Sequence, residues 1–358
     1  MQEQIVLTSE GTKMIRPYQT GDEDPINTLF TNVFQKQRSL EHWDWKYKNN
    51  LLRKTIVTVA EEDKEIAGHV ALVPYQAKWF DTEILFGART DTMVSPKHRG
   101  KGLYRLLNEE MIASAQQNNI DYLFGYPAPK AKILFEKYTG ADEVGFIPRL
   151  MKINRVSSLI INRLPFLKAF HSLLKGVDIF FRSKAYQLPE GYSLKKIEKA
   201  NHSFNSLWER GKSEYNILLK RDADFINWRF LEHPDFTYQV LGLFKADHLV
   251  GYVVTRVEEK TYGSGAIKNG YIVDLFAEPA EEIWEILLKS AITQLQEADL
   301  IQTWALEHTP SYKILTRKLK FKHKDAPMPL VGKKLNERLS EQVTLSDWYI
   351  TPGDVDSF

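Results

Sequence analysis

The chain has 358 residues, of which 43% are hydrophobic, and it carries 48 Lys and Arg against 46 Asp and Glu. This length predicts one large domain or two smaller ones, with a substantial buried core. The near balance of charge excludes a global attraction to nucleic acid, so we expect no nucleic-acid partner. There is no cysteine, which excludes thiolate catalysis, thiolate metal sites and disulfides.

Targeting and metal-binding signals are also missing from the sequence. The first residues, MQEQIVLTSEGTK, lack the basic and apolar stretches of a secretory signal, and no apolar run reaches about 18 residues. We therefore expect a cytoplasmic protein. The nine His residues show no H-x-x-x-H spacing, so no metal is predicted.

The two halves of the chain share a series of landmarks. In each half an aromatic-basic-aromatic triplet is followed by a strand glycine, a strand aspartate and a proline. The first series is Trp45-Lys46-Tyr47, Gly68, Asp91 and Pro96, and the second is Trp228-Arg229-Phe230, Gly251, Asp274 and Pro279. Successive landmarks are 23, 23 and 5 residues apart in both series. This repetition predicts two copies of one α/β unit.

The predicted copies differ in length after their shared proline. The next apolar strand begins 25 residues on in the first copy, at Asp121, but 20 residues on in the second, at Asp299. The difference falls where the first copy carries HRGKG, His98 to Gly102. A chemical role specific to the first copy is therefore expected in this loop.

A basic and apolar segment, 149–188, separates the expected domains 1–148 and 189–358. Its residues 149–184 contain eight Lys or Arg, one acid and many Leu, Ile and Phe. Such a segment is typical of a peripheral membrane contact, or of a helical linker that packs across two domains with Lys and Arg stems over apolar surface. We favour the packing interpretation, because amphipathicity is first of all a packing signal.

The segment from Val94 to Tyr104 reads as a strand end, a Gly-rich loop and a helix start. Apolar residues at 103, 106, 107, 111, 112 and 115 fit one helical face. Unpaired N–H groups and the helix dipole at this N-terminus favour an anion, and Gly100 and Gly102 allow the backbone to approach it. We expect a phosphate or pyrophosphate here.

Two common phosphate motifs do not fit this loop. A P-loop needs Ser or Thr after its lysine, whereas Lys101 is followed by Gly102. The dinucleotide fingerprint needs a third glycine three residues after the second, and that position is Arg105. Both nucleotide classes are therefore excluded.

The run Arg99-Gly100-Lys101-Gly102-Leu103-Tyr104 resembles the acetyl-coenzyme A loop of the Gcn5-related N-acetyltransferases (GNAT), whose pattern is [QR]-x-x-G-x-[GA]. Tyr104 departs from the small final residue. The resemblance covers residues 12–147, and its landmarks recur through about 331. It implies an α/β (α+β) protein of two tandem GNAT-like acyl-CoA N-acyltransferase domains, the second degenerate, each a mixed, mostly antiparallel twisted sheet flanked by helices.

The same resemblance implies how the co-substrate, acetyl-CoA, is bound without a metal. The strand before the loop splays from its neighbour, and its backbone N–H polarises the thioester, here near Met93 and Val94. The coenzyme-binding residues implied are Met93, Val94, Arg99, Gly100, Lys101, Gly102, Leu103 and Tyr104.

The acid in that family is usually a Tyr in the last helix, in a run such as Y-x-K-x-G-F. The direct match here is Phe135, with one extra residue before Gly140. Tyr138 is the available phenol and is the predicted catalytic acid. A core aromatic residue is an equal interpretation for Tyr138, because a tyrosine often buries its ring and leaves its hydroxyl in water.

The general base has no clear candidate in the sequence. Asp91 lies beside the loop, but Asp274 holds the same place in the copy that lacks the loop, which favours a structural role for both. Glu83, His69 and Glu136 remain, as does a water chain. A lone strand histidine such as His69 is more often packed or hydrogen-bonded than catalytic.

These features predict an acetyl-CoA-dependent N-acetyltransferase that is active in its N-terminal copy. Its acceptor is expected to be a primary amine of a small molecule or amino sugar, bound in a cleft between the two copies. One alternative is an aminoacyl-tRNA-dependent transferase of the Fem type, which also pairs two such folds but needs no coenzyme loop. The other is a non-catalytic acetyl-CoA-binding module, which Phe135 in the acid position favours.

Overall fold

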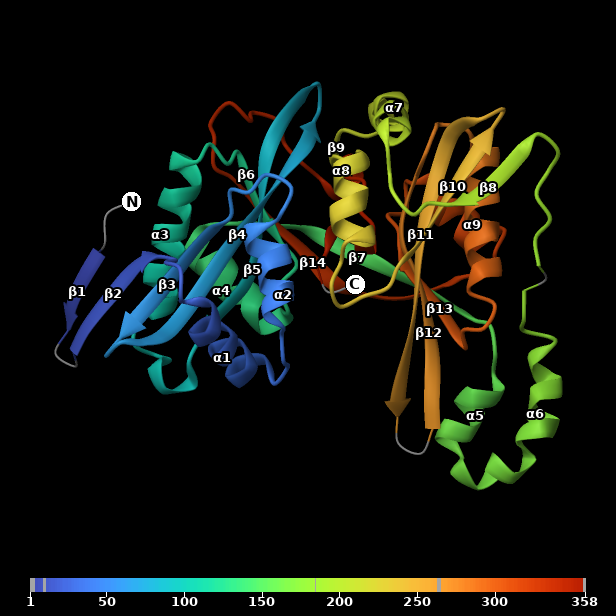
Figure 1. Ribbon diagram of the computed structural model, residues 1–358, viewed down its shortest axis with the longest axis horizontal. Helices are drawn as coiled ribbons and strands as arrows, with labels where there is room; N and C mark the ends of the chain where they lie inside the picture. The colour runs from blue at the N-terminus through green and yellow to red at the C-terminus, as the bar shows by residue number, and fades with distance from the viewer. Residues whose placement is uncertain (1–3, 9–10, 184, 263–264, 357–358) are drawn as a thin grey trace. The chain divides into compact units, whose positions relative to one another are not determined.

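The computed structural model describes residues 4–8, 11–183, 185–262 and 265–356, and the chain divides into two compact units. Unit 1 comprises Met1–Gly145, His233–Asp235 and Met328–Thr344, and unit 2 comprises Phe146–Glu232, Phe236–Pro327 and Leu345–Phe358. Each unit contains a sheet flanked by helices (Figure 1). The predicted α/β class, with mixed and mostly antiparallel sheets, is confirmed.

The sheet of unit 1 has the strand order β1-β2-β3-β4-β5-β6-β14. Its pairs are antiparallel except β5 and β6, which run parallel. The strands are β1 (Gln4–Thr8), β2 (Gly11–Pro17), β3 (Ile56–Glu62), β4 (Glu65–Trp79), β5 (Thr82–Val94), β6 (Tyr122–Gly125) and β14 (Lys322–Lys334). The helices are α1 (Glu23–Phe34), α2 (Leu40–Trp43), α3 (Leu103–Gln117) and α4 (Pro129–Thr139), with a π-helical turn at Asp44–Lys48.

The core of unit 1 lies where α3 packs on β3 and β4. Leu107 and Met111 on α3 are fully buried together with Val70 and Leu72 on β4. A Cβ atom at Gly68 would lie only 2.8 Å from Leu107 Cδ1. The strand glycine therefore permits the close approach of α3, which fixes the position of the loop before this helix.

The sheet of unit 2 has the order β7-β13-β12-β11-β10-β8. The strands are β7 (Asp142–Ile153), β8 (Tyr192–Lys196), β10 (Gln239–Lys245), β11 (His248–Tyr262), β12 (Gly265–Ala277) and β13 (Leu300–Trp304), with a short β9 (Ile217–Leu219) outside this order. The helices are α5 (Ser157–Arg163), α6 (His171–Asp178), α7 (His202–Gly211), α8 (Ala223–Ile226), α9 (Glu281–Gln294) and α10 (Pro310–Arg317). A second π-helical turn spans Asn227–Leu231.

Elements of unit 2 repeat those of unit 1 at a constant offset of 183 residues. Adding 183 to the bounds of β4, 65 and 79, gives the bounds of β11, 248 and 262, and the same addition converts β5 into β12 and α2 into α8. The strand register repeats as well, since Gly68 pairs with Val94 and Gly251 pairs with Ala277. The equal spacing of the sequence landmarks therefore corresponds to equal spacing of strands and helices.

The last strand of each sheet comes from the other half of the chain. β14 follows α10 but pairs with β6 in unit 1, whereas β7 follows α4 but pairs with β13 in unit 2. The two units therefore interleave along the sequence, while the expected domains 1–148 and 189–358 are contiguous. The expected linker, 149–188, falls within unit 2. Local patterns do not reveal such an exchange, because a strand keeps its periodicity in whichever sheet it joins.

Candidate functional site in unit 1

The predicted coenzyme loop, residues 95–102, connects the end of β5 to the start of α3 (Figure 1). Gly100 and Gly102 both have positive φ, at 80° and 82°, which L side chains rarely adopt. A Cβ atom added at either glycine would meet no atom within 4 Å. The loop is therefore bent by its glycines, and the space beside them is open for a ligand.

The backbone at the start of α3 can bind an anion. Gly102 is the N-cap residue and provides no side-chain acceptor for the first turn. The N–H groups of Leu103 and Tyr104 have no acceptor in the part of the chain that the structure describes. With no acid in the first turn of this 15-residue helix, these donors and the helix dipole fit a phosphate or pyrophosphate.

A buried carboxylate that sequence reasoning missed lies beneath the loop. Glu62, at the end of β3, is 4% exposed, and its Oε1 lies 3.7 Å from Lys101 Nζ. Its Oε2 lies 3.4 Å from His98 Nε2. Arg99 is held separately, because its Nε donates to Val94 O at 3.3 Å. Glu62 thus offsets part of the Lys101 charge, so the backbone N–H groups at the start of α3 are the stronger candidates for anion ligands.

Just before the loop, strands β5 and β6 separate from each other. We call this gap the fork and define it by β5 residues 89–94 and β6 residue 125. The parallel pairing ends at Ala88 and Phe124, although β5 continues to Val94. Ser95 N–H donates to Ala67 O on β4 at 2.8 Å. Because successive N–H groups alternate between the two edges of a strand, the Val94 N–H is directed away from β4, toward the fork. The backbone donor of Val94 therefore faces the fork, and its role toward a thioester stays a prediction.

Arg89 stands where the fork begins and was not predicted as a site residue. Its Nη2 donates to Tyr104 Oη at 2.7 Å and to Asn108 Oδ1 at 2.9 Å. The guanidinium lies 4.4 Å from the centroid of the Phe135 ring. Arg89 is half-buried, burial lowers its pKa, and it has no carboxylate partner among the described residues. An arginine remains protonated in such a setting, so the fork carries an uncompensated positive charge.

A comparison of the two halves of the sequence would have identified Arg89. The offset of 183 places Ile272 at the matching strand position of unit 2. The charged residue is therefore present only in the unit that carries the loop.

The two aromatic residues considered for the catalytic acid occupy different environments. Phe135 is 1% exposed and belongs to the hydrophobic core of unit 1. Tyr138, one turn further along α4, is half-buried, and its ring centroid lies 5.5 Å from that of Tyr104. Two phenols therefore stand near the fork, and the assignment of Tyr138 as the acid stays a prediction.

The carboxylate of Asp91 is engaged in a buried ion-pair cluster. Its Oδ2 lies 2.6 Å from Arg38 Nη1 and 3.0 Å from Lys46 Nζ, and it also accepts a short hydrogen bond from the Tyr47 hydroxyl. Burial alone would raise the pKa of Asp91, but Lys46, Arg38 and Tyr47 together hold it well below its usual range. A carboxylate that is fully charged and paired in this way is a poor proton acceptor.

Unit 2 contains a related cluster around Asp274. Arg221 lies 3.2 Å from Asp274 and 2.8 Å from Asp354, with all three side chains almost completely buried. The offset of 183 relates Arg38 to Arg221 as well as Asp91 to Asp274. The Arg–Asp pair is therefore shared by both units, which agrees with a structural role.

The other candidates for the base differ in exposure. His69 is fully buried, and burial lowers its pKa to about 4 despite a 2.8 Å hydrogen bond between its Nδ1 and Asp91 O. Glu136 is paired with Lys132 at 2.9 Å. Glu83 is exposed on β5. His69 is thus a neutral core histidine, and the general base stays unassigned.

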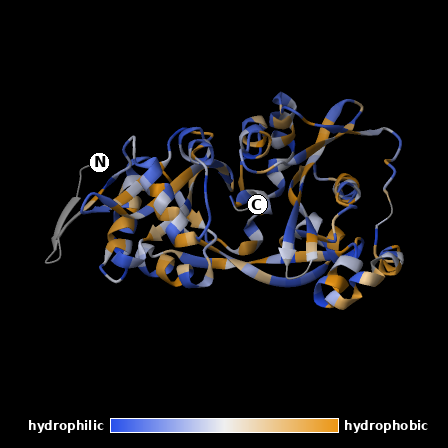
Figure 2. Ribbon diagram, turned by 60° about the horizontal axis from the view of Figure 1, so that its bottom comes forward, coloured by the Kyte–Doolittle hydropathy of each residue, from blue (hydrophilic) through white to orange (hydrophobic). Residues whose placement is uncertain are grey.

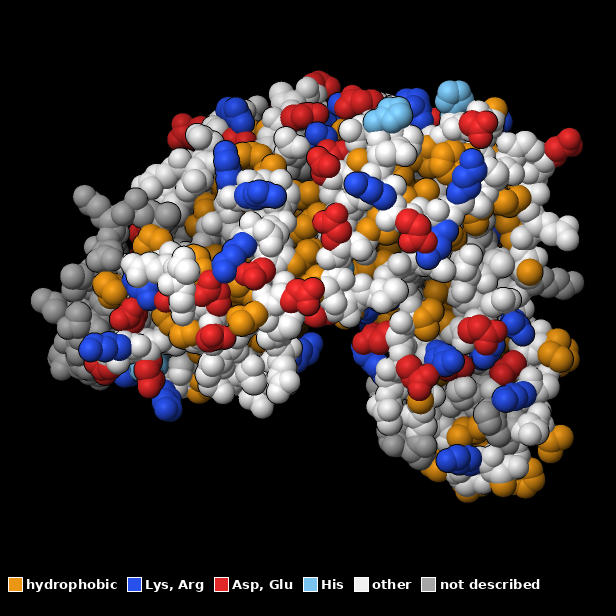
Figure 3. Space-filling view, viewed as in Figure 1, with side chains coloured by type: hydrophobic (Ala, Val, Ile, Leu, Met, Phe, Trp, Pro, Cys, Tyr) orange, Lys and Arg blue, Asp and Glu red, His pale blue; other side chains and the backbone are white. Residues whose placement is uncertain are grey.

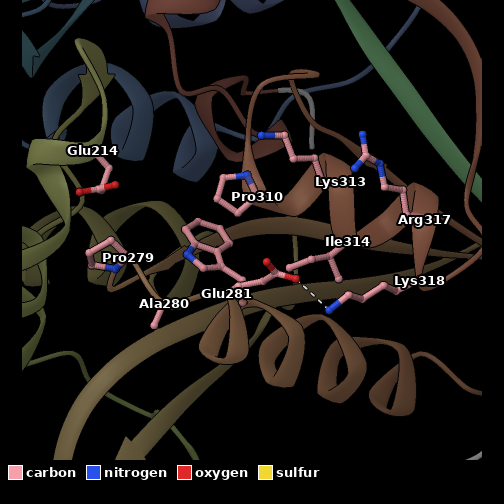
Figure 4. Close-up of a pocket in the computed structure, with 10 residues that line it drawn as sticks. Glu214, Pro279, Ala280, Glu281, Pro310, Lys313, Ile314, Arg317 and Lys318 are labelled. Carbon is pink, nitrogen blue, oxygen red and sulfur yellow. Dashed lines mark ion pairs between the residues drawn. The ribbon is translucent and has the colours of Figure 1, made fainter.

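Unit 2 has a different structure at the place that corresponds to the loop. Only residues 278–280 connect β12 to α9, whose first turn carries the acids Glu281 and Glu282. A cavity of about 320 Å³ adjoins this connection, and Glu281 on its rim pairs with Lys318 at 2.8 Å (Figure 4). The acids at the helix N-terminus oppose a bound phosphate. The anion-binding features of unit 1 are thus not reproduced here.

Within the described residues, no group of three or more His, Asp or Glu side chains could hold a metal ion. A search of the same residues also found no helix that is long and apolar enough to cross a membrane.

Comparisons with known proteins give a consistent result for the fold. Residues 14–135 match the family model of the acetyltransferase (GNAT) domain. The chain is similar to a GCN5-related N-acetyltransferase from Anabaena variabilis, with a TM-score of 0.64, 13% identity, and coverage of 90% of this chain and 73% of that one. It is also similar to Saccharomyces cerevisiae N-myristoyltransferase with bound myristoyl-CoA, with a TM-score of 0.63, 12% identity, and coverage of 92% and 80%.

A third solved structure, a probable N-acyltransferase from Enterococcus faecalis, has a TM-score of 0.62, 11% identity, and coverage of 92% of this chain and 74% of that one. The search of curated proteins found no match. The family match and the acyltransferase neighbours indicate an acyltransferase that uses an acyl-coenzyme A. The family match shows that residues 14–135 form an acetyltransferase (GNAT) domain.

Proposed function

We propose that the protein is an acetyl-CoA-dependent N-acetyltransferase that acts on a primary amine of a small molecule or amino sugar. The observation that carries this proposal is the open glycine loop at the N-terminus of α3, where backbone donors lack partners beside the fork. A pyrophosphate on the loop would direct the rest of the coenzyme along β5 toward the fork.

The structure of the fork favours a short acyl group. The side chains of Phe135 and Arg89 both pack near Gly125, since a Cβ atom at Gly125 would lie 3.0 Å from Phe135 Cε1 and 3.7 Å from Arg89 Cβ. Side chains therefore occupy the space at the base of the fork. A long acyl chain, such as the myristoyl group bound by the yeast neighbour, would have to displace them.

We further propose that the two units are tandem copies and that only unit 1 is catalytic. The constant offset of strands, helices and register supports a common origin. The shorter connection and the acids at the start of α9 support the loss of coenzyme binding in unit 2. The domain boundaries at 148 and 188 then describe the sequence copies, whereas the compact units exchange their last strands.

The reaction requires a negative charge to be stabilised as it develops. The amine nitrogen attacks the thioester carbon, the carbon–sulfur bond breaks, the sulfur takes up a proton, and the nitrogen loses one. Charge accumulates first on the carbonyl oxygen and then on sulfur. The Arg89 guanidinium and the Val94 N–H are the donors at the fork that are suited to this charge, and the phenol of Tyr138 is the proposed proton donor.

Calorimetry with acetyl-CoA and a thiol-release assay over a panel of primary amines test the proposal. We expect binding with one site per chain, and thiol release that depends on the amine. Binding without turnover on any amine would favour the coenzyme-binding module. Absence of binding would refute the coenzyme assignment, and salt-sensitive retention of tRNA on filters would then favour the Fem-type alternative.

Replacing Arg89 with Ile, the residue at the matching position of unit 2, should lower kcat on the order of a hundredfold, because a preorganised donor is lost. Coenzyme affinity should change little, since the loop is intact. The matched control is Arg105→Ile, which removes an exposed arginine of α3 that pairs with Glu109 at 3.4 Å. Equal kcat values for the wild type and Arg89→Ile would refute the role of this side chain.

A further inference from the structure

Between β7 and β8 the chain forms what we call the helical excursion, residues 157–181 of unit 2. It consists of α5, a 3₁₀ helix at Pro165–Phe170, and α6. Of the fifteen exposed large hydrophobic side chains among the described residues, eight lie in this segment. They are Leu164, Phe166, Phe170, Leu173, Val177, Ile179, Phe180 and Phe181.

The exposure of these side chains is high. Phe166 is 72% exposed, Leu173 is 74% exposed and Phe180 is 88% exposed. Figure 3 shows several groups of hydrophobic side chains along the outer edge at the lower right, where α5 and α6 lie, and Figure 2 shows hydrophobic residues along the same helices. Proteins that remain in water rarely expose contiguous apolar surface of this kind unless it contacts a partner.

The helical excursion is held at its base by hydrogen bonds, so the exposure does not arise from a frayed end. Asp178, at the end of α6, accepts from the N–H groups of Val156 and Ser157 at 2.7 and 2.9 Å, and from Ser157 Oγ at 2.6 Å. Asp178 is 8% exposed and is the single acid in residues 149–184. The carboxylate of Asp178 is therefore buried and hydrogen-bonded inside the segment, and the exposed surface of the segment carries no negative charge.

The charges that remain on the surface of the helical excursion are positive. Arg163, Lys168 and Lys175 are exposed, and none has an acidic partner among the residues that the structure describes. Arg182, just beyond the excursion, lies 3.2 Å from Glu297 and is partly neutralised. Exposed aromatic and aliphatic side chains interspersed with unpaired Lys and Arg complement a surface that is apolar and anionic.

We propose that the helical excursion docks the protein on an anionic lipid bilayer. Phe166, Leu173 and Phe180 enter the interface between headgroups and acyl chains, while Lys168 and Lys175 contact lipid phosphates. With seven and eight residues, α5 and α6 are too short to span a bilayer and lie on its surface. A second copy of the chain is a poorer occupant, because it would bring like positive charges together.

This inference revises the packing interpretation of residues 149–184. Packing accounts for Ile161, which is 8% exposed, and for the hydrogen bonds of Asp178. It does not account for eight exposed large hydrophobic side chains. The inference is independent of the proposed transferase activity and goes beyond it.

Sedimentation of the full chain with lipid vesicles tests the proposal. We expect binding to vesicles of phosphatidylcholine with phosphatidylglycerol, weaker binding to phosphatidylcholine alone, and a decline with added salt. Phe166→Ser/Phe180→Ser and Lys168→Glu/Lys175→Glu should each weaken binding by about tenfold or more. The matched controls are Val257→Ser, an exposed apolar residue of β11, and Lys322→Glu/Lys324→Glu, both exposed on β14. These controls should bind like the wild type.

Folding of each variant is checked by its thermal unfolding curve, and only variants that unfold like the wild type are compared. Failure of the wild type to bind anionic vesicles at low salt would overturn the proposal. So would binding that neither double variant weakens. Concentration-dependent dimers in analytical ultracentrifugation that Phe166→Ser/Phe180→Ser abolishes would assign the surface to a second copy, which also overturns it.

Discussion

Replacing Gly102 with Asp should weaken the binding of acetyl-CoA by roughly a hundredfold to a thousandfold while leaving the fold intact. The new carboxylate would stand at the N-cap of α3, where φ is 82° and no atom lies within 4 Å of the added Cβ. Like charges about 4 Å apart near a protein surface repel by about 4 kcal/mol, which is close to a thousandfold in Kd. Calorimetry measures the affinity, and circular dichroism reports the fold.

Gly102→Asn is the matched control for this substitution. Asn has the same size as Asp and tolerates the left-handed region similarly, so the two variants carry a similar backbone strain. The difference between them therefore reports the charge. Ala280→Asp, at the N-cap of α9, should leave the affinity unchanged. If Gly102→Asp and Gly102→Asn bind acetyl-CoA equally well, the phosphate does not lie at this helix end.

Replacing Asp91 with Asn should lower the free energy of unfolding by about 3 to 5 kcal/mol, because it leaves the buried charges of Arg38 and Lys46 without their carboxylate. The side chains of Arg38 and Lys46 are 3% and 5% exposed. Asp91 has φ of 46°, a conformation that Asn also adopts, so the backbone is not a second cause. Urea unfolding at neutral pH measures the change.

Asp63→Asn provides the matched control, since Asp63 is exposed and has φ of 53° in the turn between β3 and β4. It should unfold like the wild type. The stability that the Asp91 ion pairs contribute depends on pH with a definite sign, because the folded-state pKa of Asp91 is lowered. Its contribution is present above the unfolded-state pKa of about 3.9 and is lost as the pH falls through the folded-state value. The difference in the free energy of unfolding between the wild type and Asp91→Asn should therefore decrease in acid.

An Asp91→Asn variant with unchanged stability but greatly reduced turnover would contradict the structural role. It would return Asp91 to the list of candidates for the general base. The sequence comparison with Asp274 and the ion pairs around both aspartates favour the stability result.

The conformation of the loop before α3 is the part of the candidate site that the sequence predicted best. Gly100 and Gly102 predict positive φ angles, and the helix that starts directly after them predicts an N-terminus suited to an anion. All the residues that determine this local structure lie within about ten consecutive positions. The roles of Glu62 and Arg89 depend instead on strands that are distant in sequence. Neither side chain belongs to a local motif, and only the folded sheet brings them to the loop and to the fork.

For residues 149–184, too, the sequence predicted the composition of the segment, whereas only the fold showed which of its side chains are exposed. The amphipathic and basic composition was readable, but the sequence could not say whether the apolar residues face a protein core or the solvent. Burial is a property of the assembled fold. Phe180, at 88% exposure, could not be distinguished from the buried Ile161 by its sequence context.

By itself, the sequence determined the repeat of landmarks, the strand, loop and helix from Val94 to Tyr104, and the equivalence of Asp91 and Asp274, because each depends on spacing or on local backbone geometry. The tertiary structure decided the exchange of β7 and β14, the uncompensated charge of Arg89 in the fork, and the exposed surface of the helical excursion. The physical reason is that strand partners, charge compensation and burial are set by contacts between distant segments. Local periodicity carries no record of them.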